Sequence, residues 1–485
     1  MTNIATDPVI PVTRSDGTTT RLGLRDLLVH AHKIRHLDIP IPPAEAGLLR
    51  ILYTITCRIT GLDTHDNRNT WAEHRNTVLA TGRFDADAIN AYLGKHCWDL
   101  FDEQRPWMQD PRLPDQAERK TANVLDMTRP GDNSAIWWKH THADYAPPLP
   151  AHEAVQWLIV HHYYGSGGAG GKRTVTHNNN KTVSDQYMSS GPLRSTVTYY
   201  PLGATLFETL LAGIPAPSHT TTGDAAPWET DLNQPLGTPP APTWPAGILT
   251  GQSRHALLLD HTDNEVDGVY LTWAWKERHT PILDPYCIHN IDPKTGEAQP
   301  RQANTSRSAW RDFDALLADR PTHTRPAVLG DALDLPDDLQ DTLRVRAIGW
   351  HQDRQATNTG WYVSETPPLL RYMDEHDPAR AALAETLVTT ADKVYGAMRK
   401  ALHKAWKDAD LGDPKQCPWK DAADHLYWPA AEHIFWAHLD ANTPPEREFV
   451  DTAVRVIDTV TAPHADRLLV ARETARAIRT VRGIK

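Results

Sequence analysis

The chain has 485 residues, a length that fits two to four domains, and a formal net charge of −11 at pH 7. Its hydrophobic fraction of 40% and charged fraction of 23% are typical of a soluble globular protein, and the acidic balance excludes a protein whose whole surface coats nucleic acid. No apolar run is long enough to span a membrane, and the first residues lack the basic and apolar segments of a signal peptide.

The four cysteines lie far apart in the sequence and form no C-x-x-C pair. This spacing argues against a zinc ribbon, and so few cysteines in a long chain suit a reducing compartment. We therefore expect a cytoplasmic protein with no metal and no cofactor. The cysteines are Cys57, Cys97, Cys287 and Cys417.

The N-terminal part predicts a mixture of strands and helices. Residues 1–30 predict a strand, a turn, a second strand and a helix, in that order. Residues 43–61 predict a buried helix, with Pro43 suited to its first turn. Two shorter helical patterns follow, and residues 101–150 are irregular and rich in proline, aspartate and asparagine.

Residues 165–171 contain five glycines, and a lysine and an arginine follow them. The spacing does not fit a P-loop, which needs Ser or Thr directly after its lysine. It meets the dinucleotide spacing G-x-G-x-x-G, but the residues behind it lack the helical period that this motif requires. A nucleotide cofactor is therefore not expected. Two interpretations stay open, a flexible surface loop and a loop laid against a polyanion.

The central part of the chain alternates between loop-like and strand-like segments. Residues 214–246 hold eight prolines and predict an extended segment without regular structure, for which Trp228 and Trp244 offer anchors. Residues 268–275 predict a strand. Residues 342–364 predict a β-hairpin with a long polar tip.

From Asp377 onward, apolar residues recur at the helical period and predict four helices with short links. Asp377 suits the N-cap of the first helix, and a kink is expected at Pro429 in the second. Thr443 and Glu446 spell a capping box for the third helix. The apolar stripe expected to be buried on the fourth helix is Leu468, Ala471, Ala475 and Ile478, with Gly483 at the helix end.

These elements together predict an α+β protein. A large irregular mixed α/β domain is expected over residues 1–366, and a C-terminal four-helix bundle over residues 367–485.

The sequence contains no motif that marks an enzyme. H-E-x-x-H and G-x-S-x-G are both absent, and the adjacent His161 and His162 fit a structural role better than a metal pair. The 17 tryptophans leave one alternative open, a carbohydrate-active enzyme with stacking platforms and two facing carboxylates. Core packing is the more common use of tryptophan.

Three places in the sequence combine charge or amides in a way that suits nucleic acid. The C-terminal helix carries a row of arginines within an arc of about 120°, which suits either phosphates or a solvated helix end. The glycine segment is followed by Lys172, Arg173 and Lys181. The hairpin tip offers amides, at Gln352, Gln355 and Asn358, that can hydrogen-bond base edges, although an ordinary solvent loop is the simpler interpretation.

These segments, taken in order, resemble the CasA family, the large subunit of the type I-E CRISPR surveillance complex Cascade. The resemblance covers nearly the whole chain and rests on shared order more than on any single match. The matching segments are DPVIPV with LGLRDLL, RPWMQ, the glycine segment, LRSTV with LFETLLAGIP, and AADHLYWPAAEHIFWAHL.

The resemblance implies a protein that is not an enzyme. Such a subunit recognises the protospacer-adjacent motif (PAM) of target double-stranded DNA, promotes strand separation and R-loop formation, and helps to recruit the helicase–nuclease in antiviral defence. The implied partners are the other Cascade subunits with their CRISPR RNA, the target DNA and the helicase–nuclease, with no membrane. Cysteine pairs that occur before the lysine hairpin in the family are absent from this chain, and this departure from the family pattern predicts no zinc. Besides the DNA-recognition subunit and the carbohydrate-active enzyme, a third possible function is a purely structural scaffold in the same assembly.

The resemblance also implies which residues contact nucleic acid. A glycine loop would approach the PAM in the minor groove, where readout is degenerate, so several PAM sequences would be tolerated. It comprises Gly165, Gly167, Gly168, Gly170 and Gly171, with Lys172 and Arg173 on the flanking phosphates. A wedge on the hairpin comprises Arg354, Gln355 and Ala356. A lysine on another hairpin is assigned to Lys276, and a contact with the RNA end to Asn133, within residues 130–139. The DNA-backbone contacts of the bundle are Arg472, Arg476, Arg479 and Arg482.

Overall fold

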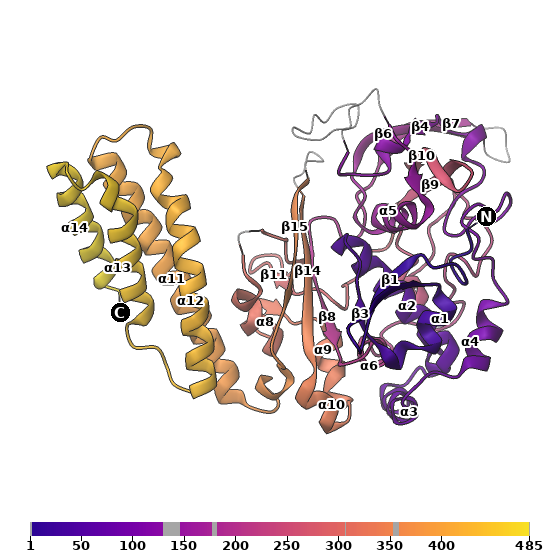
Figure 1. The fold of residues 1–485 in the computed structure, drawn as a ribbon, viewed down its shortest axis with the longest axis horizontal. Helices are drawn as coiled ribbons and strands as arrows, with labels where there is room; N and C mark the ends of the chain where they lie inside the picture. The colour runs from indigo at the N-terminus through magenta and orange to yellow at the C-terminus, as the bar shows by residue number, and fades with distance from the viewer. Residues whose placement is uncertain (1, 130–145, 177–181, 306, 353–357, 485) are drawn as a thin grey trace. The chain divides into compact units, whose positions relative to one another are not determined.

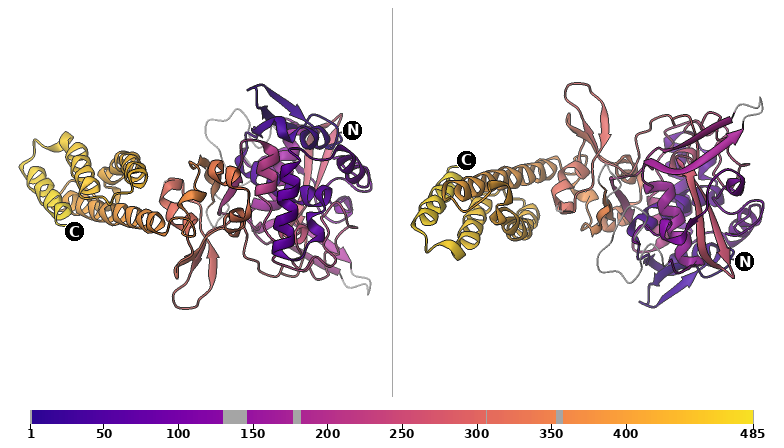
Figure 2. Two further views of the ribbon diagram at one scale, coloured as in Figure 1. Left: turned by 90° about the horizontal axis from the view of Figure 1, so that it is seen from below. Right: turned by 90° about the horizontal axis from the view of Figure 1, so that it is seen from above.

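The computed structural model describes the chain except for residues 1, 130–145, 177–181, 306, 353–357 and 485. It contains two compact units (Figures 1 and 2). The first comprises Met1–Ser306 and Thr322–Pro368, and the second comprises Arg307–Pro321 and Leu369–Lys485. The second unit therefore differs from the expected bundle in containing residues 307–321, because the short helix α8 (Phe313–Leu317) packs against α11 (Pro378–Asp408).

The first unit combines helices with several small antiparallel sheets, as expected for a mixed α/β domain (Figure 1). Its helices are α1 (Leu24–Val29), α2 (Pro42–Thr60), α3 (Arg68–Ala80), α4 (Ala86–Leu93), α5 (Ala151–Tyr164), α6 (Leu206–Ala212), α7 (Ala246–Leu249), α9 (Ala327–Asp331) and α10 (Asp337–Thr342). Its main strands are β1 (Ile10–Arg14), β2 (Thr19–Leu22), β3 (Ile34–Leu37), β6 (Gly168–Thr176), β7 (Thr182–Met188), β8 (Val197–Leu202), β9 (His255–Thr262), β10 (Glu265–Trp273), β14 (Arg344–Gln352) and β15 (Asn358–Glu365). Shorter strands are β4 (Lys120–Thr121), β5 (Leu149–Pro150), β11 (His289–Ile291), β12 (Ala298–Pro300) and β13 (His323–Thr324).

Helix α2 forms the centre of the first unit, as its continuous apolar sequence predicts. It is buried along nearly its whole length and packs against α5, α6 and β14. Arg50 lies on this helix with 2% of its side chain exposed, and it forms a two-pronged ion pair with Asp284 at 2.7 and 2.8 Å. Burial alone would raise the pKa of Asp284, but the charge of Arg50 holds it below its ordinary value.

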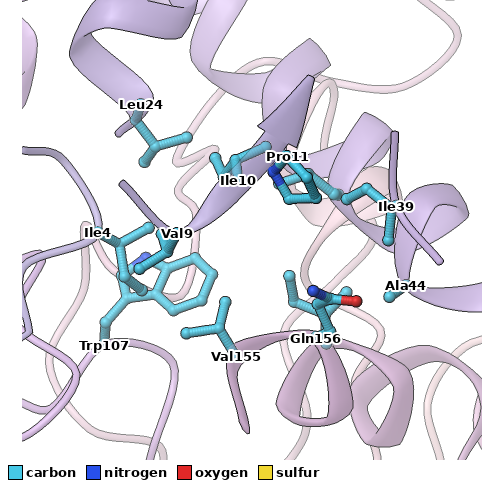
Figure 3. Close-up of a pocket in the computed structure, with 12 residues that line it drawn as sticks. Ile4, Val9, Ile10, Pro11, Leu24, Ile39, Ala44, Trp107, Val155 and Gln156 are labelled. Carbon is cyan, nitrogen blue, oxygen red and sulfur yellow. The ribbon is translucent and has the colours of Figure 1, made fainter. Parts of the chain in front are cut away.

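The strand β1 and the helix α5 enclose a small apolar void of about 10 Å³ (Figure 3). Trp107 and Val155 line it from one side, and Ile10 and Leu24 from the other (Figure 3). Because this void is no larger than about one water molecule, the two elements are effectively in close packing.

The proline-rich segment 214–246 has no helix or strand before α7, as the sequence predicts. Both proposed anchors are buried, Trp228 with 6% and Trp244 with 0% of the side chain exposed. Asp224 secures the segment further, because its carboxylate accepts hydrogen bonds from Arg58 on α2 and from the main chain at Ala246. The segment therefore lies against the core, and it lines a cavity of about 650 Å³ with residues 106–110.

The second unit contains the four predicted helices, α11, α12 (Pro418–Ala441), α13 (Glu448–Thr461) and α14 (Leu468–Arg482) (Figure 2). Asp377 caps α11 as expected, accepting a hydrogen bond from the Arg380 N–H at 3.0 Å. Helix α12 continues through Pro429. The predicted capping box is wrong, because α13 begins at Glu448, two residues beyond Glu446, and its N-cap forms no side-chain cap.

The predicted buried stripe of α14 is also wrong. The buried residues are Val470, Glu473, Ala477 and Val481, whereas Leu468 is 85% exposed. Val470, Ala477 and Val481 also recur at helical spacing, but Glu473 interrupts them. Packing selects this face and places Glu473 inside the bundle, where Arg472 and Arg476 neutralise it.

Candidate nucleic-acid interface

The glycine segment connects the end of α5 to a β-hairpin. Only residues 165–167 lie outside regular structure, since β6 begins at Gly168 and pairs with β7. The expectation of a loop over the whole segment is therefore wrong for Gly168, Gly170 and Gly171. The register shifts between Ala169 and Arg173, which marks a β-bulge. Lys181 lies outside the described residues.

Two of the glycines are required by packing inside the protein. A Cβ at Gly165 would lie 2.5 Å from the ring of His255, and a Cβ at Gly171 would lie 2.3 Å from the carbonyl oxygen of Leu271. The Thr272 hydroxyl also donates to the Gly171 carbonyl at 2.7 Å. Gly165 leaves room for the His255 ring and Gly171 for the main chain of β10, so neither is available to a ligand.

Gly168 has the opposite surroundings. It is exposed, its φ is +105°, and a Cβ built on it would meet nothing within 4 Å. Its conformation is one that glycine adopts readily and other residues adopt with strain. At Gly167 and Gly170, a Cβ would meet the side chains of Ser190 and Met188. Gly168 is thus the glycine whose backbone is open to an external molecule.

The assignment of Arg173 to a phosphate contact is wrong. Its side chain is 0% exposed and forms an ion pair with Asp110 at 2.8 Å. It also hydrogen-bonds the Gln116 side chain and donates to the Trp273 carbonyl at 2.9 Å. The physical reason is strand alternation, which turns Lys172 outward and Arg173 inward. Burial opposes the ionisation of Asp110, but hydrogen bonds from Arg112 and the charge of Arg173 hold its pKa below its ordinary value.

Lys276 lies beside the glycine hairpin. Its ammonium forms an ion pair with Asp185 of β7, and its main-chain N–H donates to the Pro235 carbonyl at 2.9 Å. Its side chain is 42% exposed. The structure therefore brings Lys276 and the glycine hairpin together. Its charge is already partly compensated by Asp185.

One surface residue beside the glycines was missed by sequence reasoning. Tyr187 of β7 stands opposite Ala169 and is 65% exposed. An aromatic residue in an otherwise polar strand, a few residues from the glycine segment, is the signal that could have identified it. Tyr187 is thus an exposed aromatic residue, one residue pair along the hairpin from Gly168.

The hairpin of β14 and β15 forms as predicted, and β14 also pairs with β8 (Figure 1). The wedge residues Arg354, Gln355 and Ala356 lie outside the described residues, and so does Asn133. Gln352 is described, and the suggestion that its amide faces bases is wrong. The side chain is 4% exposed, and its amide is bonded to the protein.

The four arginines of α14 divide into two pairs. Arg472 and Arg476 each hydrogen-bond the buried carboxylate of Glu473 at 2.8 Å. Burial works against the ionised form, but these two arginines hold the pKa of Glu473 below its ordinary value. Arg479 and Arg482 are exposed. Unlike Arg472 and Arg476, these two arginines do not neutralise Glu473.

The paired histidines and the tryptophans, which the sequence also singled out, are explained by packing inside the protein. His161 and His162 are buried, and each hydrogen-bonds a main-chain carbonyl, at 2.9 Å to Leu125 and 2.8 Å to Met108. Burial lowers the pKa of His161 to about 3 and that of His162 to about 4, so both are neutral structural residues. Every tryptophan among the described residues is buried or half-buried, which leaves no exposed stacking platform there.

The described part of the chain contains no group of three or more His, Cys, Asp or Glu residues placed to hold a metal ion. None of its helices is both long and apolar enough to cross a membrane.

Comparison with known proteins decides the family. Residues 3–461 match the family model of CRISPR-associated protein Cse1. The chain belongs to the Cse1 family. A curated relative, CRISPR-associated protein CasA/Cse1 of Thermus thermophilus, is 26% identical over 369 residues, which span 73% of this chain and 68% of the relative.

Solved structures agree with this membership. A chain of a CRISPR RNA-guided surveillance complex is 34% identical, covers 99% of both chains and superposes with a TM-score of 0.89. A second, from a surveillance complex described as pre-nicking, is 35% identical with a TM-score of 0.79, covering 99% of this chain and 98% of the other. The structure of Thermus thermophilus CasA (Cse1) is 20% identical with a TM-score of 0.79, over 99% of this chain and 98% of that one, and supports the Cse1 fold.

Proposed function

We propose that this Cse1-family chain is the non-catalytic large subunit of a type I-E Cascade complex. In this role it reads the PAM of target double-stranded DNA, promotes strand separation and R-loop formation, and helps to recruit the helicase–nuclease. Two of its relatives were solved within CRISPR RNA-guided surveillance complexes, which supports assembly with other subunits and a guide RNA. Guide pairing would then carry most of the sequence specificity.

The observation that carries the proposal is the exposed backbone at Gly168. It joins a left-handed conformation to open space, with Lys172 on the same strand pointing outward. A bare backbone can enter a narrow minor groove that side chains would block. Lys172 and Lys276 would bind the adjoining phosphates, which position the duplex without specifying sequence.

Further residues would contact the separated DNA strands, the guide RNA and the DNA backbone. Gln355 and Ala356 would act as a wedge that separates the first base pairs, and Asn133 would contact the RNA end. In the bundle, Arg479 and Arg482 would bind DNA phosphates, because Arg472 and Arg476 already serve Glu473.

A pair of matched glycine variants tests the proposal. Gly168 and Gly17 both have positive φ, at +105° and +85°, and neither would bring a Cβ within 4 Å of other atoms. Valine at either position costs a similar backbone strain of about 1–2 kcal/mol, but only Gly168→Val places a side chain on the proposed DNA surface.

The assay is duplex binding by the reconstituted guide-RNA complex at fixed salt. We expect Gly168→Val to weaken PAM-dependent binding by at least about tenfold, whereas Gly17→Val binds as the wild type does. Equal binding by the two variants would show that the Gly168 surface does not contact the PAM.

A further inference from the structure

The last residue pair of the β14–β15 hairpin has an unusual geometry. Gln352 pairs with Asn358, and the register shifts between His351 and Gln352. The extra residue lies on β15, between Asn358 and Gly360, so β14 keeps its regular alternation up to Gln352. Gln352 lies on the same face of β14 as Ile348 and Trp350, which are also buried, and the residue is 4% exposed.

The amide of Gln352 is fully used by the protein. Its Oε1 accepts from the Ser195 N–H at 3.2 Å, and its Nε2 donates to the Tyr164 carbonyl at 3.3 Å and to Asn358 Oδ1 at 3.0 Å. The main-chain carbonyl of Gln352 also accepts a hydrogen bond from the Ser195 hydroxyl. One side chain thus connects both strands of the hairpin to two other segments.

Both of those segments contact residues 165–167, the part of the glycine segment outside regular structure, which we call the glycine turn. Tyr164 is the last residue of α5 and directly precedes Gly165. Ser195 ends a short segment in which the Gly191 N–H donates to the Gly165 carbonyl at 2.9 Å and Arg194 donates to Ser166 Oγ at 2.9 Å.

Ser195 itself is held in a costly conformation. Its φ is +59°, in the left-handed region that a serine adopts with strain. Such conformations persist where surrounding bonds over-determine them. Here those bonds come from Gln352 on one side and from the Ala303 N–H, which donates to the Ser195 carbonyl at 2.7 Å, on the other.

We propose that Gln352 is a positioning residue that joins the glycine turn and the loop end of the β14–β15 hairpin into one rigid unit. Docking of duplex DNA at the glycine turn therefore also positions the hairpin, so that PAM binding is coupled to strand opening. This inference rests on the proposed function and adds to it a coupling between its two steps.

The test uses Gln352→Met in the full chain within the guide-RNA complex. Methionine keeps length and volume but removes all the side-chain hydrogen bonds. The matched control is Gln340→Met in α10, because Gln340 also donates to two main-chain carbonyls, of Leu333 at 3.0 Å and Leu335 at 2.7 Å, away from the glycine turn. Gln352→Glu serves as a second variant, since it keeps an acceptor for Ser195 but loses the donor to Tyr164.

Three DNA probes separate the steps. A PAM duplex without guide complementarity reports docking. A complementary target with 2-aminopurine next to the PAM reports the rate of strand opening. A target with mismatched, already open base pairs beside the PAM bypasses opening.

We expect both Gln352 variants to dock within about threefold of wild type and to open the duplex about tenfold more slowly, because part of the net contribution of the lost hydrogen bonds is removed from the opening step. The pre-opened target should restore wild-type rates, and Gln340→Met should match wild type throughout. Opening at the wild-type rate by both Gln352 variants would overturn the coupling. An equal loss on the pre-opened target would also overturn it, by showing a general structural role. A wild-type complex without any PAM dependence would instead refute the proposed function itself.

Discussion

Arg173 and Lys172 are sequence neighbours with opposite roles, and exchanging each for methionine separates those roles sharply. Arg173→Met removes the buried partner of Asp110, which is 7% exposed, and leaves the Gln116 side chain and the Trp273 carbonyl short of a donor. Breaking a buried, hydrogen-bonded ion pair on one side costs about 3–5 kcal/mol. Arg112 still contacts Asp110 at 2.7 Å, so the lower end of that range, about 3 kcal/mol, is expected.

Lys172→Met should leave the stability of the protein nearly unchanged but weaken its binding to DNA. The lysine is exposed on the opposite face of the same strand, and surface substitutions of this kind change the free energy of unfolding by no more than about 0.5 kcal/mol. Loss of one phosphate contact should, however, lower the slope of log affinity against log salt by about 1.

The assays are urea unfolding of the full chain, followed by tryptophan fluorescence, and DNA binding of the reconstituted complex at several salt concentrations. The reasoning is refuted if Arg173→Met unfolds at the wild-type urea concentration while reducing the salt dependence of binding. That result would mean that Arg173 faces DNA and not Asp110.

Three further predictions concern stability. Burial lowers the pKa of His162 to about 4 in the folded protein, whereas in the unfolded chain this pKa has its ordinary value of 6.5, so the free energy of unfolding should fall as the pH drops from 6.5 toward 4. His162→Gln should reduce this pH slope by about 1.4 kcal/mol per pH unit in urea unfolding. An unchanged slope would contradict a buried, neutral His162 ring. Gly171→Ala places a Cβ 2.3 Å from the Leu271 carbonyl oxygen and should destabilise the first unit by about 1–3 kcal/mol; thermal unfolding at the wild-type temperature would show that the strands are not in close contact there. Asp377→Ala removes the N-cap of α11 and should cost about 1 kcal/mol in the second unit, measured by urea unfolding, and no change would argue against the capping bond.

The sequence predicts best those elements whose pattern has one physical solution. The hairpin of β14 and β15, the four C-terminal helices and the buried helix α2 all follow from periodicity and flanking residues. Helix α14 shows the limit. Its buried face contains Glu473 between apolar residues, so it is the packing of the other helices and the pairing of Glu473 that bury this face and not the fully apolar stripe.

The sequence indicates the segments of the candidate site but not the surroundings of each residue in them. Glycine composition alone does not distinguish Gly171, needed for close packing on β10, from Gly168, which lies open on the surface. The inward direction of Arg173 depends on where strand β6 begins, and that of Gln352 depends on which face of β14 packs against the rest of the first unit. Each of these features is set by tertiary contacts between segments far apart in the sequence, so local patterns carry no signal for them.

The most direct test of the central claim measures duplex binding by the guide-RNA complex reconstituted with and without this chain. One target carries a permitted PAM and the other a scrambled PAM, at the same salt concentration. The proposal predicts that adding the chain creates a preference for the permitted PAM. Assembly of the chain into the complex with no change in PAM preference would contradict it and favour a purely structural subunit.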